Sequence, residues 1–164
     1  MKGYKTLKRI VWVVTACILA YFTAVSCSEE ADCSMTARPM LNANIYTIDV
    51  ESGLAIRDTL DILTITAAGT DSVILNNEEN VISLSLPLRY AVDSTVLVFH
   101  YSFLRYDTVV IRHANTPYFL SMDCGYQMQQ ALTGTSYTRH VLDSISITNS
   151  EVSIYGTENI RLFY

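Results

Sequence analysis

The chain of 164 residues is poor in glycine, proline, histidine and, beyond its first residues, lysine. It has six glycines, three prolines and three histidines, and no lysine follows Lys8. It contains neither a glycine-rich phosphate loop nor the G-x-S-x-G sequence of a nucleophile elbow. His100, His113 and His140 each lack the second histidine four positions away that a helical metal site needs. We therefore predict no catalytic residues, no metal and no cofactor, and hence no enzymatic activity.

The apolar run near the N-terminus is short. Residues 10–25 carry no charge, but this run is shorter than the roughly 20 residues of a membrane-spanning helix. Because it follows four basic residues and ends in small ones, it is typical of a secretory signal peptide, which we place at residues 1–26. The alternative is a short signal anchor, for which Trp12 and Tyr21 suit the membrane interfaces.

Positive charge is scarce in the rest of the chain. Beyond the predicted signal peptide, seven arginines face sixteen acidic residues, which gives a balance of −9. Such a surface repels nucleic acid and anionic lipid headgroups. We therefore predict no nucleic-acid partner.

The signal peptide ends in Ala24-Val25-Ser26-Cys27, which resembles a bacterial lipobox. In that motif the cysteine is diacylated and the signal is cut just before it. Leucine is usual where this chain has Ala24, but looser boxes ending in Ser-Cys are common in lipoproteins of the Bacteroidetes. The resemblance implies a lipid anchor at Cys27, and several acyl chains hold a protein on a membrane firmly.

An acidic tether, residues 27–36, follows the predicted anchor. Ser28-Glu29-Glu30 and Asp32 resemble the tract that sends Bacteroidetes lipoproteins to the cell surface. The alternative is a solvated linker, since short charged segments bury too little to fold. We expect a lipid-anchored protein of the outer membrane, with the cell surface favoured over the periplasmic face.

Two cysteines remain once Cys17 leaves with the signal peptide and Cys27 takes lipid. In an oxidising compartment, Cys33 and Cys124 indicate a disulfide. It would close a loop of 91 residues and stabilise the fold by about 4–5 kcal/mol on the chain-entropy account. A metal pair is the alternative, but two cysteines supply only half of a zinc site.

Residues 37–164 suit one domain, and apolar and polar residues alternate along most of it. The alternating segments are short and rich in isoleucine, valine, threonine and tyrosine, with turn-forming residues between them. This pattern predicts an all-β antiparallel two-sheet sandwich, immunoglobulin-like. We expect turns at residues 67–72, 76–80 and 102–107, and a helical turn or two only at residues 126–132. Residues 71–80 also offer oxygen ligands to calcium, but without the spacing of an EF-hand loop.

Five triplets share the form Asp, then Ser or Thr, then an aliphatic residue or Thr. Average residue usage gives roughly one such triplet in a chain of this size. The form resembles the O-glycosylation acceptor of exported Bacteroidetes proteins. The alternative is that turn-to-strand junctions produce the same triplet, since Asp favours turns and β-branched residues favour strands. The candidate acceptors are Thr59, Ser72, Ser94, Thr108 and Ser144.

The segment Ser102–Tyr106 is expected to form a hairpin tip that contacts a protein partner. Phe103, Arg105 and Tyr106 are of the types enriched at protein interfaces. Tyrosine is abundant in the second half of the chain, so the alternative is a carbohydrate-binding surface that uses Tyr-rich loops. A hydrolase with an unrecognised site is a third hypothesis.

The order of several fragments resembles a family of uncharacterised Bacteroidetes lipoproteins that is defined only as a domain of unknown function. The fragments are DCSMTARPML, SLPL, YDTVVI, DCGYQM and the closing ENIRLFY, and the resemblance spans residues 33–164. It implies a small cell-envelope domain without assigned activity, and it supports the pairing of Cys33 with Cys124. We therefore expect a non-catalytic structural or protein-interaction module, accessory to an integral outer-membrane protein.

Overall fold

The computed structural model describes Trp12 and residues 38–70, 72–122 and 124–164. Contacts divide the chain into two units, Met1–Cys33 and Ser34–Tyr164, and the fold below is that of the second. Apart from Trp12, the predicted signal peptide and tether lie outside the described residues. Among the described residues, no helix is long and apolar enough to cross a membrane.

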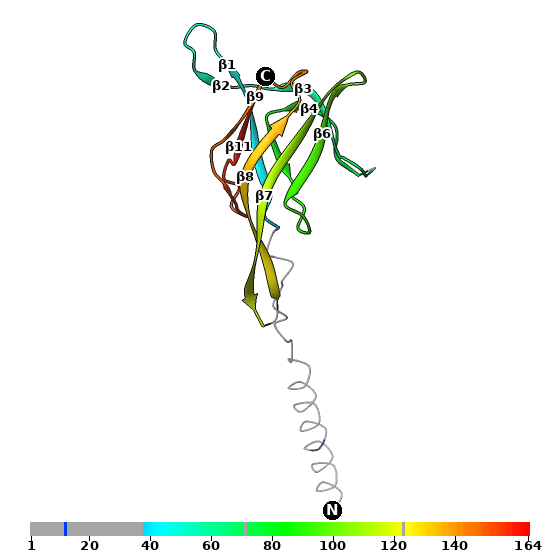
Figure 1. The fold of residues 1–164 in the computed structure, drawn as a ribbon, viewed down its shortest axis with the longest axis vertical. Helices are drawn as coiled ribbons and strands as arrows, with labels where there is room; N and C mark the ends of the chain where they lie inside the picture. Colours follow the sequence, from blue (N-terminus) through cyan, green and yellow to red (C-terminus); the bar gives the residue numbers. More distant parts are fainter. Residues whose placement is uncertain (1–11, 13–37, 71, 123) are drawn as a thin grey trace, which may run out of the picture. The chain divides into compact units, whose positions relative to one another are not determined.

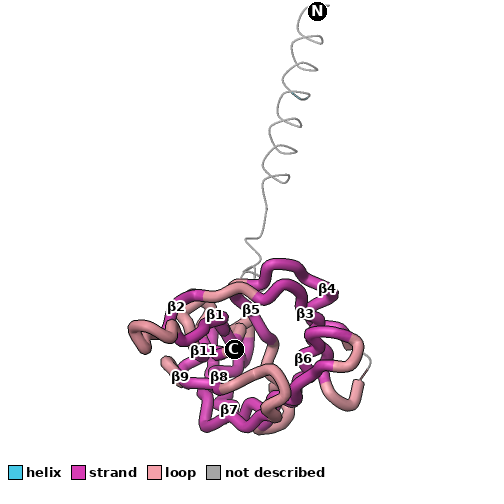
Figure 2. Tube along the Cα trace, turned by 90° about the horizontal axis from the view of Figure 1, so that it is seen from above, coloured by secondary structure: helices cyan, strands magenta, loops and turns pink. Residues whose placement is uncertain are grey.

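The described part of the domain consists of strands in two sheets (Figures 1 and 2). The first sheet contains β1 (Leu41–Ile48), β2 (Ala55–Arg57), β5 (Ser83–Leu86), β9 (Ser144–Ile147) and β11 (Ile160–Phe163). The second contains β3 (Leu60–Ala67), β4 (Val73–Val81), β6 (Ser94–Ser102), β7 (Arg105–Ser121), β8 (Gly125–Tyr137) and β10 (Glu151–Val152). Their orders are β2-β1-β11-β9, with β5 also on β1, and β10-β8-β7-β6-β3-β4. β1 and β11 pair in parallel, and the other pairs are antiparallel.

Apolar and polar residues that alternate along the sequence lie on opposite faces of each sheet. In β6, for example, Thr95, Leu97 and Phe99 are buried while the residues between them are half-buried. The inward faces of the two sheets meet in one apolar core. Fully buried members from both sheets include Leu41, Ile45, Leu63, Ile65, Leu86, Leu97, Phe99, Val109, Ile111, Ile160 and Leu162. The predicted all-β two-sheet sandwich is confirmed.

Two local predictions are wrong. Residues 126–132, predicted as helical, lie within β8, because β7 pairs with that strand from Tyr137 to Gly125. Residues 76–80, predicted as a turn, lie within β4. Asn77 and Asn80 adopt positive φ of 50° and 55° there, and the pairing with β3 is irregular. Because asparagine tolerates this backbone region, β4 bends without reversing.

Candidate functional site

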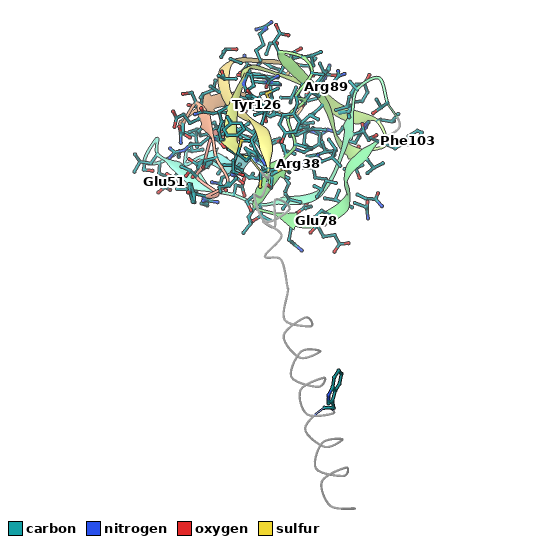
Figure 3. All side chains as sticks on the ribbon, turned by 90° about the horizontal axis from the view of Figure 1, so that it is seen from below. Arg38, Glu51, Glu78, Arg89, Phe103 and Tyr126 are labelled. Carbon is teal, nitrogen blue, oxygen red and sulfur yellow. The ribbon has the colours of Figure 1, made fainter. Side chains whose placement is uncertain are left out.

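The hairpin between β6 and β7 ends in a two-residue turn, Phe103-Leu104. Ser102 pairs with Arg105 across it, so the strands approach closely and both turn side chains project outward. Phe103 is 98% exposed and Leu104 is 82% exposed. Figure 3 shows Phe103 at the rim of the domain. Exposed apolar side chains that lie next to one another are typical of a contact surface.

Of the other residues predicted for this tip, Tyr106 also has a structural role. Its ring lies between those of His100 and His140, with centroids 6.0 and 6.2 Å away. His140 Nδ1 lies 3.0 Å from the carbonyl oxygen of Tyr106 and donates to it. Arg105 is exposed at the first position of β7. The structure thus brings Phe103, Arg105 and Tyr106 to one hairpin end, with Tyr106 tied to its neighbours.

A hollow of about 710 Å³ adjoins this tip on the outer face of the second sheet. The bend of β4 contributes to it, since the Asn77 amide donates to Thr64 Oγ1 at 2.9 Å. His100, one of its lining residues, has its Nε2 3.2 Å from Thr66 Oγ1. The lining combines hydrogen-bonding and aromatic side chains: Ile62, Thr64, Asn77, His100, Tyr101, Ser102 and Phe103.

Below the tip, the carboxylate of Asp107 ties β7 to the segment that follows β8. Asp107 is fully buried. Its Oδ1 accepts from Thr138 Oγ1 at 2.7 Å and from the His140 amide at 2.8 Å. Its Oδ2 accepts from the amides of Val141 and Leu142 at 2.8 and 2.9 Å. Burial acts to raise the pKa of Asp107, but these hydrogen bonds outweigh it and hold the pKa below the ordinary 3.8.

A second buried polar group, His113, lies further along β7. Its Nε2 is 2.9 Å from Thr95 Oγ1, and its Nδ1 is 3.0 Å from Asn115 Oδ1. Because the amide oxygen of Asn115 can only accept, Nδ1 of His113 donates to it, and the neutral ring carries its proton on Nδ1. In that form Nε2 accepts from the Thr95 hydroxyl, whose oxygen also accepts from the Arg89 amide at 2.9 Å. Burial lowers its pKa below 6.5, against the opposing influence of Asn115 and of Asp93.

The pKa of His113 makes the fold sensitive to mildly acidic pH. Since its pKa is lower in the folded chain, the unfolded chain binds the proton more readily, and stability falls as pH drops below 6.5. We expect a lower urea midpoint at pH 5 than at pH 7.5. His113→Gln should lower the free energy of unfolding at pH 7.5 by about 1–3 kcal/mol, through imperfect pairing of Thr95 and Asn115, and weaken this pH dependence. The half-buried His100→Gln is the control, and an equal loss of pH dependence there would contradict the assignment.

The predicted cysteine sites are only partly within the described structure. Cys27 and Cys33 lie outside the described residues. Cys124 lies half-buried in the turn between β7 and β8, where its amide donates to Ser121 Oγ at 3.0 Å. The lipid on Cys27 and the Cys33–Cys124 disulfide stay predictions.

Most of the predicted O-glycosylation acceptors lie where strands begin. Thr59 and Ser72 are exposed and immediately precede β3 and β4. Ser94 and Ser144 are half-buried first residues of β6 and β9. Thr108 is half-buried inside β7, where its amide donates to Thr138 Oγ1 at 2.9 Å. The junction explanation therefore fits four of the five triplets, and modification stays a prediction.

In the part of the chain that the structure describes, potential metal ligands lie apart from one another. Within residues 38–70, 72–122 and 124–164, no group of three or more histidine, cysteine or acidic residues is placed to hold a metal ion. The calcium alternative placed at residues 71–80 falls mainly on the strand β4. Sequence reasoning missed the binding partners of Asp107, because they depend on a chain segment about 30 residues away.

Comparison with known proteins gives one match. Residues 62–164 match a family of unknown function, DUF6452. No curated protein and no solved structure matches the chain. The match begins at β3 and includes the hairpin tip, the Asp107 network and the β7–β8 turn. The chain therefore belongs to the DUF6452 family of unknown function.

Proposed function

We propose that this protein is a lipid-anchored module of the cell envelope that binds a protein partner at the outer membrane and has no catalytic role. The lipobox-like Ala24–Cys27 and the acidic tether support anchoring at Cys27. The predicted disulfide between Cys33 and Cys124 belongs to the same proposal, since exported compartments are oxidising. The acidic tract favours the cell surface, and protease treatment of intact cells tests this: full protection would contradict surface exposure.

The observation that carries partner binding is the exposure of Phe103-Leu104. Both side chains are exposed at the end of the β6–β7 hairpin, Phe103 to 98% and Leu104 to 82%. Phe103 and Leu104 thus present apolar surface without any role in the core. Arg105 beside them adds a residue type that is enriched in binding hot spots.

Co-purification tests the proposal. We expect protein tagged at Tyr164 and solubilised from envelopes in detergent to retain a stoichiometric outer-membrane partner. Its intact mass should equal the mature chain from Cys27 plus acyl groups, with any further mass assigned to sugar. Recovery of the protein alone would contradict partner binding, and an unprocessed or unacylated mass would contradict the anchor.

Replacing Phe103 and Leu104 together with serine should abolish co-purification and leave stability within about 0.5 kcal/mol, because neither side chain is buried. The matched control is Val50→Ser with Leu54→Ser, at the end of the β1–β2 hairpin, where the side chains are 98% and 65% exposed. This control should keep the partner. Equal loss in both variants would show that the contact is not specific to the β6–β7 tip.

Carbohydrate binding is the second candidate, and the hollow beside Phe103 is the observation that favours it. Aromatic rings and hydrogen-bonding side chains on one concave surface suit the two faces of a sugar ring. A glycan array tests this, with His100→Ala as the variant expected to lose binding. An array without signal for the native protein would remove this candidate.

A further inference from the structure

Strands β7 and β8 continue well beyond the rest of the sandwich as a two-stranded arm, residues 116–122 and 124–129 (Figure 1). The pairing of β7 with β6 ends at Arg112. β10 reaches β8 only at Gln130 and Ala131. Among the strands that the structure describes, β7 and β8 therefore pair only with each other along the arm. A ribbon of two strands depends on packing against a further surface for its stability in water.

The surface of the arm is apolar and aromatic. Phe119 is 52% exposed, Met122 90% and Tyr126 76%, and Tyr118 and Leu120 are exposed as well. Phe119 and Tyr126 pair across the strands, with their rings edge to face at 5.5 Å. Asp123 is the one charged residue between positions 114 and 138.

One face of the arm is an extension of the core-facing side of the sheet. Alternate residues of β7 from Val109 through His113 are buried, and the same alternation leads outward to Phe119. Gln130 of β8 is buried on this face as well. Inside the sandwich this side of β7 and β8 packs against the first sheet. On the arm the same side is exposed.

Arg38, the first described residue of the domain, lies at the base of this arm. The guanidinium of Arg38 lies 5.9 Å from the ring centroid of Tyr90. The carbonyl of Tyr90 in turn accepts from Asn115 Nδ2 at 3.0 Å. Asn115 also accepts from Gln130 Nε2 at 2.8 Å, which closes the base of the arm.

The lengths of the tether and the arm are compatible with a common membrane surface. Arg38 lies eleven positions after Cys27, and such a segment reaches at most about 36–40 Å. From Asn115 to Ser121 the arm extends about 20 Å. An anchor at Cys27 therefore allows the end of the arm to reach the membrane that holds the anchor.

We propose that the end of the arm, formed by Phe119, Leu120, Met122 and Tyr126, inserts into the lipid surface that carries the Cys27 anchor. This inference rests on the proposed lipidation. Aromatic rings with a polar edge favour the interface between headgroups and acyl chains, and the lack of positive charge in the arm suits zwitterionic lipid. β7 begins directly after the Phe103-Leu104 turn and ends in the arm, so Phe103 would then point away from the membrane.

Tryptophan fluorescence tests the insertion, because Trp12 is the single tryptophan of the chain and lies in the predicted signal peptide. The full chain is expressed with its own signal, and the processed protein is placed in phosphatidylcholine vesicles, with or without bromine near the headgroup end of the acyl chains. Tyr126→Trp reports the arm, and Phe103→Trp is the matched control at the far end of β7. The native protein gives the background emission.

We expect the Tyr126→Trp emission to shift to shorter wavelength in vesicles and to lose most of its intensity with brominated lipid. Phe103→Trp should show neither change. Adding Phe119→Ser and Met122→Ser to Tyr126→Trp should return its emission to that of an exposed tryptophan.

Three results would overturn the inference. A blue shift without quenching would mean that protein, a second copy or a partner, covers the arm. Emission typical of water would leave the arm in solvent, and equal quenching of both variants would exclude insertion by one end. Vesicle flotation and intact mass of the same sample report the anchor independently. The proposed lipidation is therefore tested separately from the insertion.

Discussion

Replacing Asp107 with alanine is expected to lower the free energy of unfolding by about 3–5 kcal/mol, because it removes the shared acceptor of a buried hydrogen-bond network. The variant would leave four donors without their acceptor: Thr138 Oγ1 and the amides of His140, Val141 and Leu142. Each unpaired buried group costs about 1–3 kcal/mol, less where water replaces the carboxylate. Urea denaturation followed by circular dichroism measures the loss.

Asp107→Asn separates the charge of this side chain from its shape. The amide keeps one acceptor oxygen, but its NH₂ group faces donors, so we expect a loss nearly as large as for alanine. Asp143→Ala is the control, because Asp143 belongs to another Asp-Ser/Thr triplet and is exposed; it should change stability by less than about 0.5 kcal/mol. Equal, small effects at both positions would show that Asp107 does not hold residues 138–142.

The contribution of Asp107 also has a defined pH range. Its pKa is lower in the folded chain, so the unfolded chain takes up the proton first as pH falls. The stabilisation is complete above an ordinary carboxyl pKa near 3.8 and is lost as pH drops through the lower folded value. Asp107→Asn should remove this acid-dependent loss, whereas the loss below pH 6.5 that we assign to His113 should remain.

The sequence pattern was sufficient to predict the strands but not their neighbours in space. The alternation of apolar and polar residues predicts which residues of β6 face the core. The buried residues of β6 in the structure agree with this prediction. The alternation does not reveal that β1 pairs in parallel with β11, more than 110 residues away, because strand pairing depends on the whole chain. The helical prediction at residues 126–132 failed for a related reason. Polar residues such as Gln127 and Gln129 suit either structure, and pairing with β7 decides the outcome.

The candidate site shows the same division between local and distant information. The exposed turn Phe103-Leu104 could be predicted, since two strand-like segments flank it and tight hairpin turns project their side chains into solvent. The triplet at Asp107 looked like its four counterparts. Its buried role depends on residues 138–142, which no local pattern places beside it. The arm was missed because its apolar residues alternate as they do in a strand that is covered on one face.

Loss of the predicted Cys33–Cys124 disulfide is expected to have the second large effect. On the chain-entropy account, a bridge that closes 91 residues stabilises by about 4–5 kcal/mol. Cys124→Ser should therefore lower the urea midpoint strongly and raise the slope, because the unfolded chain without the bridge is more expanded. Since the loop spans β1 to β7, the effect acts on the unfolded chain and requires no change in the packing of the core.

A double-mutant comparison separates a bridge from two unrelated cysteines. If Cys33 and Cys124 are bonded, then Cys33→Ser, Cys124→Ser and the double variant should all match the reduced native protein. Additive, small losses would contradict the bridge, as would an oxidised mass equal to the reduced one. A bridge would also fix the end of the arm to a residue six positions after Cys27, within about 20 Å of the lipid. Cleaving it should then weaken the lipid quenching of Tyr126→Trp, which links the covalent prediction to the position of the arm on the membrane.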